Sequence, residues 1–514
     1  MVLTQDRLSL AKRVVLALMV ATMFFGRQIA SWTHPANRYL YHWQRSDAFL
    51  LIAAVVLTGL LVLAIEAMLH RLGGSRTRCG LRLAFVLGVG QLVVALVLTP
   101  NAELPIQGAA AASVATAGVS LAGFWRAEAL VVRSVVRTCF FFAPLPFLLF
   151  GQMVSWRSWR TCPDSFLEPG PARDARPVFL LMFDEWSLER SWDGTTFLPQ
   201  LGRLRELAER SFVFANARSP GSASYVSIPR ILFQENGQVV VANGEARWET
   251  GGDSVPVESH PNLFRLARSH GYETSMIGWY LPYAALVGSD LDACRVLPQT
   301  IKRQGALRLW DMVWANLQFL PDPASRAIWR ALFSHVFSVT WFELHGTIEA
   351  EALRVARESP LNSFAVLHYT LPHAPFIFEA DGRYRGPFPK GRMQGSTEDY
   401  GRHLEYMDVV LGRFLDALKQ SGKFDSALVM VTSDHSWKLD PAPGATTEER
   451  LRRIPLLVKW PGQDFQATVR NDVCLLGLGA IIEAAIGQRK SAQEAREALA
   501  GLMRGPRVGQ CLEP

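Results

Sequence analysis

The sequence predicts a chain of two parts. The first, residues 1–160, is an α-helical membrane domain with about five spanning helices. The second, residues 178–514, is an α/β domain with a largely parallel sheet flanked by helices. Charge separates the two parts: residues 1–160 hold 15 Lys and Arg against 5 Asp and Glu, whereas the remaining residues hold 38 against 41. Strand-like and helix-like segments alternate after residue 177, and this alternation is typical of α/β folds.

Apolar stretches in the first part have roughly the 20 residues that a membrane-spanning helix needs. They are residues 14–32, 48–69, 80–99, 104–125 and 138–156. Because no small-residue cleavage site follows the first stretch, we expect a retained span rather than a removed signal peptide. Arginines gather at the N-terminus and in the second and fourth loops, which predicts that the C-terminal part faces the extracytoplasmic side. The alternative is four spans with a peripheral first helix.

A proline-rich linker, residues 161–177, joins the two parts. The part that follows is slightly acidic, so nucleic acid is not an expected partner, because nucleic-acid binders carry a basic stripe. The cysteines are scattered and form no CxxC pair, which argues against a Cys-ligated metal site. The cysteines after residue 160 could form one or two disulfides if this part lies in an oxidising compartment. They are Cys162, Cys294, Cys474 and Cys511.

In the second part, short apolar runs predict strands at Val178–Phe183, Tyr272–Trp279, Ser363–Tyr369, Ala427–Thr432 and Leu456–Trp460. Helical patterns lie between them at Leu198–Ser211, His260–His270 and Thr397–Ser421. Near the C-terminus, Asn471–Gly487 has the pattern of a helix packed on the domain. Sites in such sheets form at the carboxyl ends of the strands, so the residues that close each strand are the first candidates.

Predicted strand ends carry side chains that bind divalent metals. They are Asp184 with Glu185, His368 with His373, and Asp434 with His435. Asp, Glu and His are the natural ligands for zinc and similar ions. Taken singly, an Asp at a strand end is more often a helix cap or turn former, and a His near a strand is more often a buried core residue. Their joint occurrence at several strand ends favours a metal site.

A hydroxyl-rich turn, Ser219 to Pro229, lies between the first and second predicted strands. Clusters of Ser, Gly and Pro are usually loops. However, a serine at a helix N-terminus beside a divalent cation can lose its proton and attack an ester. The helix amides and the metal then stabilise the charged oxygens of the transferred group. The turn therefore supplies a candidate nucleophile.

These segments, in this order, resemble the alkaline phosphatase superfamily in its sulfatase-like branch. The likeness is to membrane-bound phosphoethanolamine transferases and lipoteichoic acid synthases, which pair a five-span anchor with an external catalytic domain. It covers most of residues 175–465, including PNLFRLARSHGYET, the helix EYMDVVLGRFLDALKQSG leading into SALVMVTSDHS, and the strand IPLLVKWPG. The resemblance implies an enzyme of the bacterial inner membrane whose catalytic domain lies outside the cytoplasm.

The resemblance also implies roles for individual residues. Ser224 stands five residues before Pro229, at the position of the transferases' nucleophilic threonine. The metal ligands by position are Asp184, assisted by Glu185, with Asp434 and His435. The substrate-binding residues are His368, His373 and Ser222. The implied cofactor is a divalent metal, zinc first, with manganese, magnesium or calcium as alternatives.

Two positions depart from the family pattern. Ser227-Ile228-Pro229 is followed by Arg230-Ile231, which breaks the Cys/Ser-x-Pro-Ser-Arg signature that sulfatases convert to formylglycine. Oxidative maturation, and with it true sulfatase chemistry, is therefore not expected. Ser436 and Trp437 replace the usual glycine and its follower after His435, and no clear histidine ligand lies downstream.

The leading hypothesis is a transferase or phosphodiesterase that moves a phosphoethanolamine- or phosphoglycerol-type group on an envelope lipid or glycan through a serine nucleophile. The membrane anchor would confine the enzyme and a lipid-linked substrate to one surface. The alternatives are a sulfuric or phosphoric ester hydrolase that transfers to water, and a catalytically silent relative that binds an envelope component. A transporter ranks last, because the predicted spans hold few ionisable residues.

Overall fold

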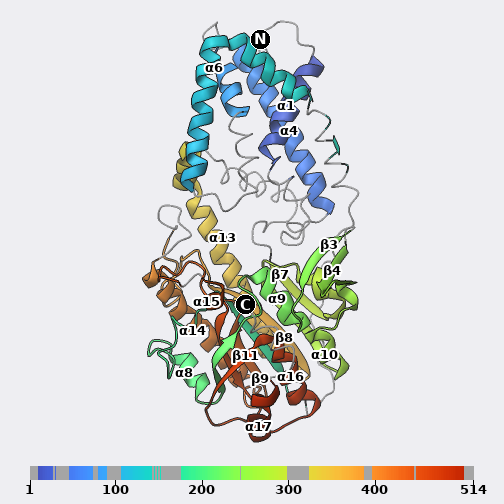
Figure 1. Cartoon of the computed structure of the whole chain (residues 1–514), viewed down its shortest axis with the longest axis vertical. Coiled ribbons are helices and arrows are strands. Elements are labelled where there is room, and N and C mark those ends of the chain that lie inside the picture. Colours follow the sequence, from blue (N-terminus) through green and yellow to red (C-terminus); the bar gives the residue numbers. More distant parts are fainter. Residues whose placement is uncertain are drawn as a thin grey trace. The chain divides into compact units, whose positions relative to one another are not determined.

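The computed structural model describes residues 10–26, 29, 45–72, 79–80, 82–89, 106–141, 144, 147–148, 151, 175–242, 245–297, 323–386, 396–444 and 447–502. The chain forms two compact units (Figure 1). The first unit is Met1–Ser158 with Gln299–Phe333, and the second is Trp159–Pro298 with Ser334–Pro514. The predicted linker lies outside the described residues up to residue 174.

The first unit is helical over its described part, with α1 (Leu10–Phe24), α4 (Arg45–Leu72) and α6 (Ile106–Phe141). One described helix, α4, is long and apolar enough to cross a membrane, with a mean hydropathy of 3.0 over Ala48–Met68. The span predicted at 138–156 lies mostly outside the described residues, and the one at 80–99 is described only in part. The described part of the first unit therefore contains one helix that is long and apolar enough to cross a membrane, and the multi-span arrangement stays a prediction.

Two features of these helices bear on the membrane prediction. The predicted loop between the fourth and fifth spans, residues 126–137, is wrong, because α6 continues through it to Phe141 with a kink at Ala127 (φ −151°, ψ 51°). Between α1 and α4, Arg13 Nε lies 3.0 Å from Glu66 Oε2. A carboxylate in an apolar helix is costly unless it is paired, and this arginine supplies the pair.

The second unit is built on an eight-stranded sheet in the order β11-β2-β10-β9-β1-β8-β6-β7. Its strands are β1 (Val178–Asp184), β2 (Phe212–Arg218), β6 (Glu273–Trp279), β7 (Ala293–Leu297), β8 (Ser363–Pro372), β9 (Leu428–Ser433), β10 (Arg453–Lys459) and β11 (Ala467–Cys474). Among these strands only β10 runs antiparallel to its neighbours, β2 and β9. The largely parallel sheet predicted from the sequence is therefore present in the described part of the chain.

A second, three-stranded antiparallel sheet is formed by β3 (Gln238–Ala242), β4 (Glu245–Thr250) and β5 (Asp253–Pro256). The helices of the second unit are α8 (Gly202–Ala208), α9 (Ser224–Phe233), α10 (Leu263–Ser269), α11 (Tyr283–Val287), α14 (Thr397–Gln420), α15 (Glu448–Leu451), α16 (Leu478–Ile482) and α17 (Ala492–Leu502). The long helix α13 (Pro323–Glu358) enters this unit from Ser334 onward. Shorter helical turns are Val257–Ser259, Gly288–Asp290, Leu475–Gly477 and Glu483–Gly487.

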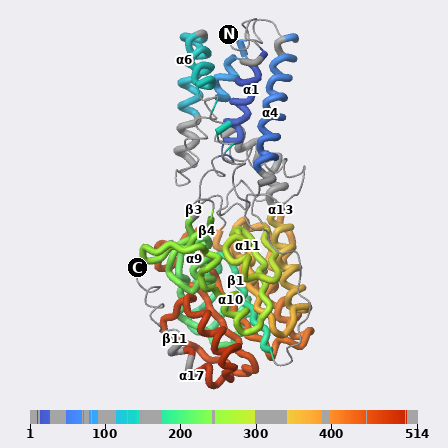
Figure 2. Tube along the Cα trace, turned by 90° about the vertical axis from the view of Figure 1, so that its right-hand side faces the viewer, coloured from blue at the N-terminus to red at the C-terminus, as the bar shows by residue number. Residues whose placement is uncertain are grey.

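Helices cover both faces of the large sheet. Phe179 of β1 packs against Phe414 of α14, with ring centroids 5.5 Å apart. Phe364 of β8 packs against Phe264 of α10 at 5.2 Å. Val178 is paired with Phe364, so Phe364 and Phe179 point to opposite faces, because side chains alternate along a strand. Helix α10, which also contacts α9 and α16, therefore covers the face opposite to α14. Figure 2 shows α10 near α9.

The central strands are apolar on both sides, as strands under two helical layers should be. All seven residues of β1 and all six of β9 are buried. The five strands predicted from the sequence are present, with their ends shifted by at most three residues. The predicted helix Asn471–Gly487 is wrong at its start, because residues up to Cys474 complete β11 and the helical turns begin at Leu475.

Candidate active site

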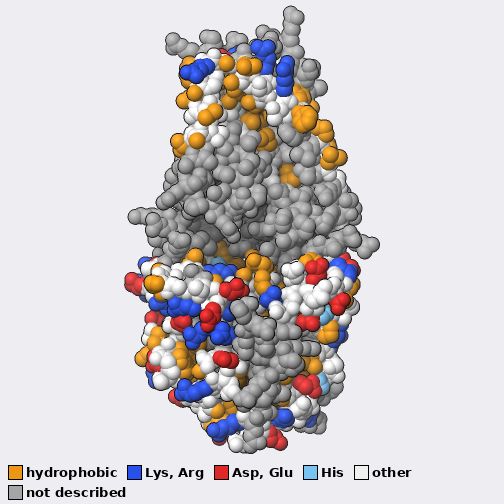
Figure 3. Space-filling view, in the orientation of Figure 1, with side chains coloured by type: hydrophobic (Ala, Val, Ile, Leu, Met, Phe, Trp, Pro, Cys, Tyr) orange, Lys and Arg blue, Asp and Glu red, His pale blue; other side chains and the backbone are white. Residues whose placement is uncertain are grey.

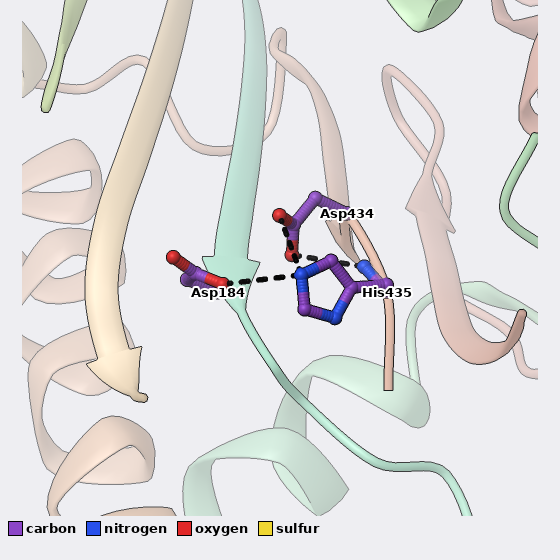
Figure 4. Close-up of side chains that lie close together, drawn as sticks. All are labelled: Asp184, Asp434 and His435. Carbon is purple, nitrogen blue, oxygen red and sulfur yellow. Dashed lines mark hydrogen bonds and ion pairs between the residues drawn. The ribbon is translucent and has the colours of Figure 1, made fainter. Parts of the chain in front are cut away.

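The site lies where two neighbouring strands end. Asp184 closes β1, and Asp434 and His435 follow β9 directly. Because β1 and β9 are paired in parallel, their carboxyl ends meet at the same edge of the sheet. The three side chains are buried and point toward one another (Figure 4), and each offers one ligand atom within 4.8 Å of the others.

The atoms of this cluster fit a divalent cation. His435 Nε2 lies 3.8 Å from Asp184 Oδ1 and 3.5 Å from Asp434 Oδ2. Both carboxylate oxygens are buried, and neither has a hydrogen-bond partner in the described part of the chain. Buried carboxylate oxygens without donors are costly, and a cation between them removes that cost. Two carboxylates and an imidazole are the donor set of zinc and related ions.

Electrostatics support the same conclusion. The pKa of Asp184 is raised well above its usual value by burial, and by the charges of Asp434 and Glu185. Burial also raises the pKa of Asp434, but the lowering contributions, led by those of His435 and His368, together outweigh it, so the net direction is downward. The pKa of His435 is lowered, first by burial. Without a cation this cluster holds more negative charge than its surroundings stabilise.

His435 presents a defined nitrogen to the site. Its Nδ1 lies 2.8 Å from the carbonyl oxygen of Ser436, to which it donates, because a carbonyl only accepts. The lone pair is therefore on Nε2, and Nε2 lies 3.2 Å from Ser224 Oγ. Ser224 is thus part of the same cluster as the candidate metal ligands.

Ser224 is the first residue of α9, so its position follows from the turn before it. Gly221 is required there, because a Cβ would lie 2.9 Å from Val226 Cγ1 and 3.0 Å from the backbone nitrogen of Ser227. The other serines of the turn differ from Ser224. Ser227 Oγ donates to the Ala223 carbonyl at 3.0 Å. Ser222 is half-buried and has no hydrogen bond to a described side chain, so its predicted substrate role stays a prediction.

Glu185 follows the strand end in an unusual conformation, with φ +63°. Its backbone nitrogen donates to Asp434 Oδ1 at 3.3 Å. The Tyr400 hydroxyl donates to its carbonyl at 2.7 Å and accepts from the Ser187 nitrogen at 2.8 Å. The Glu185 Oε2 atom is buried and has no hydrogen-bond partner in the described part of the chain. Glu185 therefore lies beside the cluster, outside the set of three that converge most closely.

The two histidines predicted from β8 also reach the site. His368 is fully buried, with Nδ1 2.8 Å from the Tyr283 hydroxyl and Nε2 3.9 Å from Asp184 Oδ2. Burial lowers the pKa of His368 to about 4. His373 Nε2 lies 3.9 Å from Glu185 Oε1. The His373 side chain is 23% exposed, so it is the histidine of the pair that a substrate can reach.

His373 is held between aromatic rings. It is stacked on Trp341 of α13 with centroids 6.0 Å apart and planes 10° apart. The ring of Trp279 meets its edge at 5.6 Å. These indoles restrict the imidazole to one orientation, and together they form an aromatic wall beside the carboxylates of β1.

Several supporting residues were not predicted. Ser433 Oγ accepts from the Trp186 nitrogen at 2.9 Å and lies 2.7 Å from the Phe183 carbonyl, which fastens β9 to the end of β1. Ser433 directly precedes Asp434, so its position was a usable signal. Tyr283 and Tyr400 come from helices far along the chain, and nothing local in the sequence marks them.

The cysteines divide between the two units. Cys79 and Cys139 are free. Cys294 of β7 and Cys474 of β11 are disulfide-bonded, and these strands are the opposite edges of the large sheet. Cys162 and Cys511 lie outside the described residues. The second unit therefore contains disulfide-bonded cysteines, Cys294 and Cys474, as the sequence allowed.

An α/β domain with acidic and histidine side chains at the ends of neighbouring parallel strands, and a serine at a helix N-terminus, has the arrangement expected of an enzyme of the alkaline phosphatase type. The family model described as Sulfatase matches residues 178–474. The chain belongs to this family, and is an enzyme of the alkaline phosphatase superfamily. No curated protein matches the chain.

Solved structures of low identity are similar over part of the chain. Ps i-CgsB, in complex with k-i-k-neocarrahexaose, is 15% identical with a TM-score of 0.44 and covers 64% of this chain and 77% of its own. The phosphonate monoester hydrolase of Agrobacterium radiobacter is 16% identical, with a TM-score of 0.40, covering 61% and 74%. The zinc complex of the C-terminal periplasmic domain of EcEptC from Escherichia coli is 14% identical, with a TM-score of 0.39, covering 65% and 87%.

Proposed function

We propose that this chain is a membrane-bound enzyme that transfers or cleaves a phosphoester group on an envelope lipid or glycan, with Ser224 as the nucleophile. The observation that carries this proposal is the position of Ser224. Its Oγ lies 3.2 Å from His435 Nε2, within the buried cluster of Asp184, Asp434 and His435, and at the first residue of α9. The nucleophile, the cation site and the helix amides would then all act on the same bound phosphoryl group.

The contrast with Ser227 supports phosphoester chemistry over sulfatase chemistry. Ser227 is the residue that would align with the formylglycine position of sulfatases, but its side chain is fully buried and bonded to the Ala223 carbonyl. Ser224 instead faces the metal ligands. A serine that attacks directly needs no oxidative maturation, so the broken signature around Ser227 is no obstacle to this reaction.

The residues that would hold a divalent cation, zinc by preference, are Asp184, Asp434 and His435, with Glu185 beside them. A bound cation of this kind lowers the pKa of a coordinated hydroxyl and neutralises charge on phosphoryl oxygens. The donor atoms with no other partner, Asp184 Oδ1 and Asp434 Oδ2, are the specific reason to expect one.

The reaction would proceed in two displacements at phosphorus. Ser224 Oγ forms a bond to phosphorus while the bond to the leaving alcohol breaks, and the Ser224 proton passes to water, because the cation would occupy the Nε2 lone pair of His435. The leaving oxygen takes a proton from His373, which is partly exposed beside Glu185. An acceptor hydroxyl or water then attacks the phosphoseryl group, breaks the bond to Oγ and returns the protons.

The proposed location is the bacterial inner membrane, with the second unit outside the cytoplasm. Helix α4 has the length and hydropathy of a span, and the first unit exposes large apolar side chains such as Leu57 (55%), Leu61 (59%) and Val119 (75%) to its surroundings (Figure 3). Disulfides at Cys294 and Cys474 suit an oxidising compartment. On the face drawn in Figure 3, acidic and basic side chains are interspersed over the second unit, which does not favour nucleic acid.

The test compares two serines of one helix. The full chain, purified in detergent and loaded with zinc, is assayed on bis(4-nitrophenyl) phosphate and on 4-nitrophenyl sulfate. We expect turnover of the phosphodiester and little of the sulfate. Ser224→Ala should lower kcat/KM by about 10³-fold or more, whereas Ser227→Ala should stay within a few-fold.

Faster turnover of the sulfate ester would favour the sulfuric ester hydrolase. Loss of activity in Ser227→Ala but not in Ser224→Ala would identify Ser227 as the nucleophile. No turnover of either ester by zinc-loaded protein would favour a silent relative that binds an envelope component. Addition of a polyol acceptor such as glycerol separates the transferase from the hydrolase, because only a transferase would form the glycerol phosphoester.

A further inference from the structure

Residues 373–378 follow β8 directly and begin with His373, the histidine that the proposed reaction uses as an acid. Nδ1 of His373 contacts the Ala374 carbonyl oxygen, to which it donates, because a carbonyl only accepts. The other ring nitrogen, Nε2, lies 3.9 Å from Glu185 Oε1. The orientation of the imidazole therefore depends on the backbone of the segment that carries it.

The last residue of this segment is bonded to a buried histidine of α14. His403 is 1% exposed, and its Nε2 accepts from the backbone nitrogen of Phe378 at 3.2 Å. The pKa of His403 is lowered to about 3, first by burial, so the ring is neutral at pH 7. A neutral imidazole has one acceptor nitrogen, and in His403 this nitrogen is Nε2. A side chain of α14 thus satisfies the buried N–H of Phe378.

The segment also packs on the His403 ring. The ring of Phe376 meets it with centroids 5.0 Å apart and planes 71° apart, and the ring of Phe378 lies at 5.5 Å. Phe376 in turn meets the rings of Tyr400 and Trp437 edge-on, each at 6.2 Å. Residues 373–378 are therefore fixed to α14 both by a hydrogen bond and by aromatic packing.

The position of His403 on α14 calls for an explanation, because its buried neighbours Leu404 and Met407 are apolar members of the same core. Burial of an imidazole is costly unless its nitrogens are used, and the bond to Phe378 uses one of them. A leucine in its place would fill the space but leave the Phe378 N–H buried without an acceptor. The segment would then have to shift to regain a partner.

We infer that His403 is a positioning residue for His373: its Nε2 fixes the backbone of residues 373–378 and so holds the His373 imidazole in the orientation that faces the site. The inference rests on the proposed function for what His373 does there, whereas the contacts of His403 are independent of it. The rival explanation is that His403 only fills the core, and that Trp341 and Trp279 alone orient the His373 ring.

Reaction of His373 with diethyl pyrocarbonate separates the two explanations without any turnover, because this reagent modifies accessible neutral imidazoles. The full chain, purified in detergent and loaded with zinc, is treated near neutral pH, and the modification rate of each histidine peptide is followed by mass spectrometry. His403→Leu removes the acceptor and keeps an apolar filling. His403→Gln returns an acceptor oxygen near the position of Nε2. Met407→Leu is the matched control, because Met407 is fully buried one turn further along α14.

We expect His373 to react at least about threefold faster in His403→Leu, because the shifted segment releases its ring from the aromatic wall. His403→Gln and Met407→Leu should stay within about 1.5-fold of the wild type. The internal control is His270, whose side chain is 29% exposed and pairs with Glu483, and its rate should be the same in every variant.

The inference is overturned if His403→Leu leaves the His373 rate unchanged, if His403→Gln reacts as fast as His403→Leu, or if Met407→Leu accelerates His373 as much. His403→Asn, whose amide oxygen reaches only to the position of Nδ1, replaces the leucine variant should the latter not fold, with the same expectation.

Turnover keeps the two proposals apart. If the expected modification rates are found but the wild type cleaves no ester, the proposed function fails and the positioning role of His403 stands. If the wild type is active, His403→Leu should lower kcat more for diphenyl phosphate than for bis(4-nitrophenyl) phosphate, because the poorer leaving group needs the His373 proton more. An equal loss for the two esters would contradict the inference.

Discussion

Tyr400 is predicted to be the residue that keeps the turn after β1 in its working shape. Its hydroxyl joins two backbone groups of that turn, accepting from the Ser187 nitrogen and donating to the Glu185 carbonyl. Glu185 has a left-handed backbone conformation, which a glutamate adopts only when its surroundings impose it. Tyr400→Phe removes the hydroxyl and leaves the packing of the ring on Trp437 in place.

The expected loss of stability follows from the two backbone groups that lose their hydrogen-bond partner, the Ser187 nitrogen and the Glu185 carbonyl. Ser187 and Glu185 are buried, and each unsatisfied buried group costs about 1–3 kcal/mol, so the variant should lose about 2–6 kcal/mol of stability. A water molecule in the vacated space would bring the loss to the lower end. Because Glu185 and its neighbour Asp184 move together, zinc affinity should also fall, by about 10- to 100-fold.

The control is a tyrosine of the same helix. The Tyr406 hydroxyl lies 3.5 Å from Glu349 Oε2, far along α14 from the turn, so Tyr406→Phe should cost less than about 1 kcal/mol. Urea unfolding of both variants measures stability, and competition with a zinc-binding dye measures metal affinity. The reasoning is refuted if the two variants lose similar stability, or if Tyr400→Phe binds zinc as tightly as the wild type.

Further predictions concern the cation site and the small sheet. The pKa of Asp184 is raised in the folded state, so its protonated form adds stability that is present below about pH 4 and is lost as pH rises through the folded pKa. Asp184→Asn should therefore unfold at a higher temperature than the metal-free wild type at pH 7, and a lower melting temperature would contradict this. Chelation of zinc held at about 100 times its Kd should cost the wild type about 2.7 kcal/mol and this variant much less, as seen in thermal melts. Gly237→Ala should lose about 1–3 kcal/mol, because its Cβ would lie 2.6 Å from the Glu249 carbonyl oxygen and from Trp248, whereas Gly346→Ala, with open space around it, should be neutral or stabilising in the same urea titration.

The central strands and the residues at their ends could be predicted because their signal is local. β1 is a continuous apolar run that stops at Asp184, and β9 begins with four apolar residues and is followed by Asp434. Strands buried on both faces have this pattern, and parallel pairing brings their ends together. The close approach of Asp184, Asp434 and His435 follows from these two facts, as does the presence of Ser224 beside them once α9 is in place.

Three other features, the end of β11, the direction of β10 and the extent of α6, could not be predicted in the same way. β11 alternates half-buried and exposed residues along ATVRNDVC. Because its polar residues interrupt the apolar run that marks a central strand, its last residues were assigned to a helix. β10 has the apolar pattern of a central strand in either direction, and only its pairing reveals that it is antiparallel. Arginines within α6 suggested a loop, because charge in an apolar segment is normally a boundary signal.

The residues that support the site were missed for a different reason. Tyr400 and Tyr283 act through contacts between segments that are far apart in sequence, 215 residues for Tyr400 and Glu185 and 85 for Tyr283 and His368. A buried tyrosine on an amphipathic helix has the same local pattern whether its hydroxyl holds a catalytic turn or only fills a core. Tertiary structure is needed to tell these cases apart.

The most direct test of the central claim is mass spectrometry of the Ser224 peptide. The full chain is expressed in a bacterial host, quenched in acid and digested, alongside Ser224→Ala and Ser227→Ala. We predict a phosphoryl-containing adduct on Ser224 that is absent from the first variant and retained in the second, and its mass would identify the transferred group. Formylglycine at Ser224 or Ser227, or an adduct that survives in Ser224→Ala, would contradict this account.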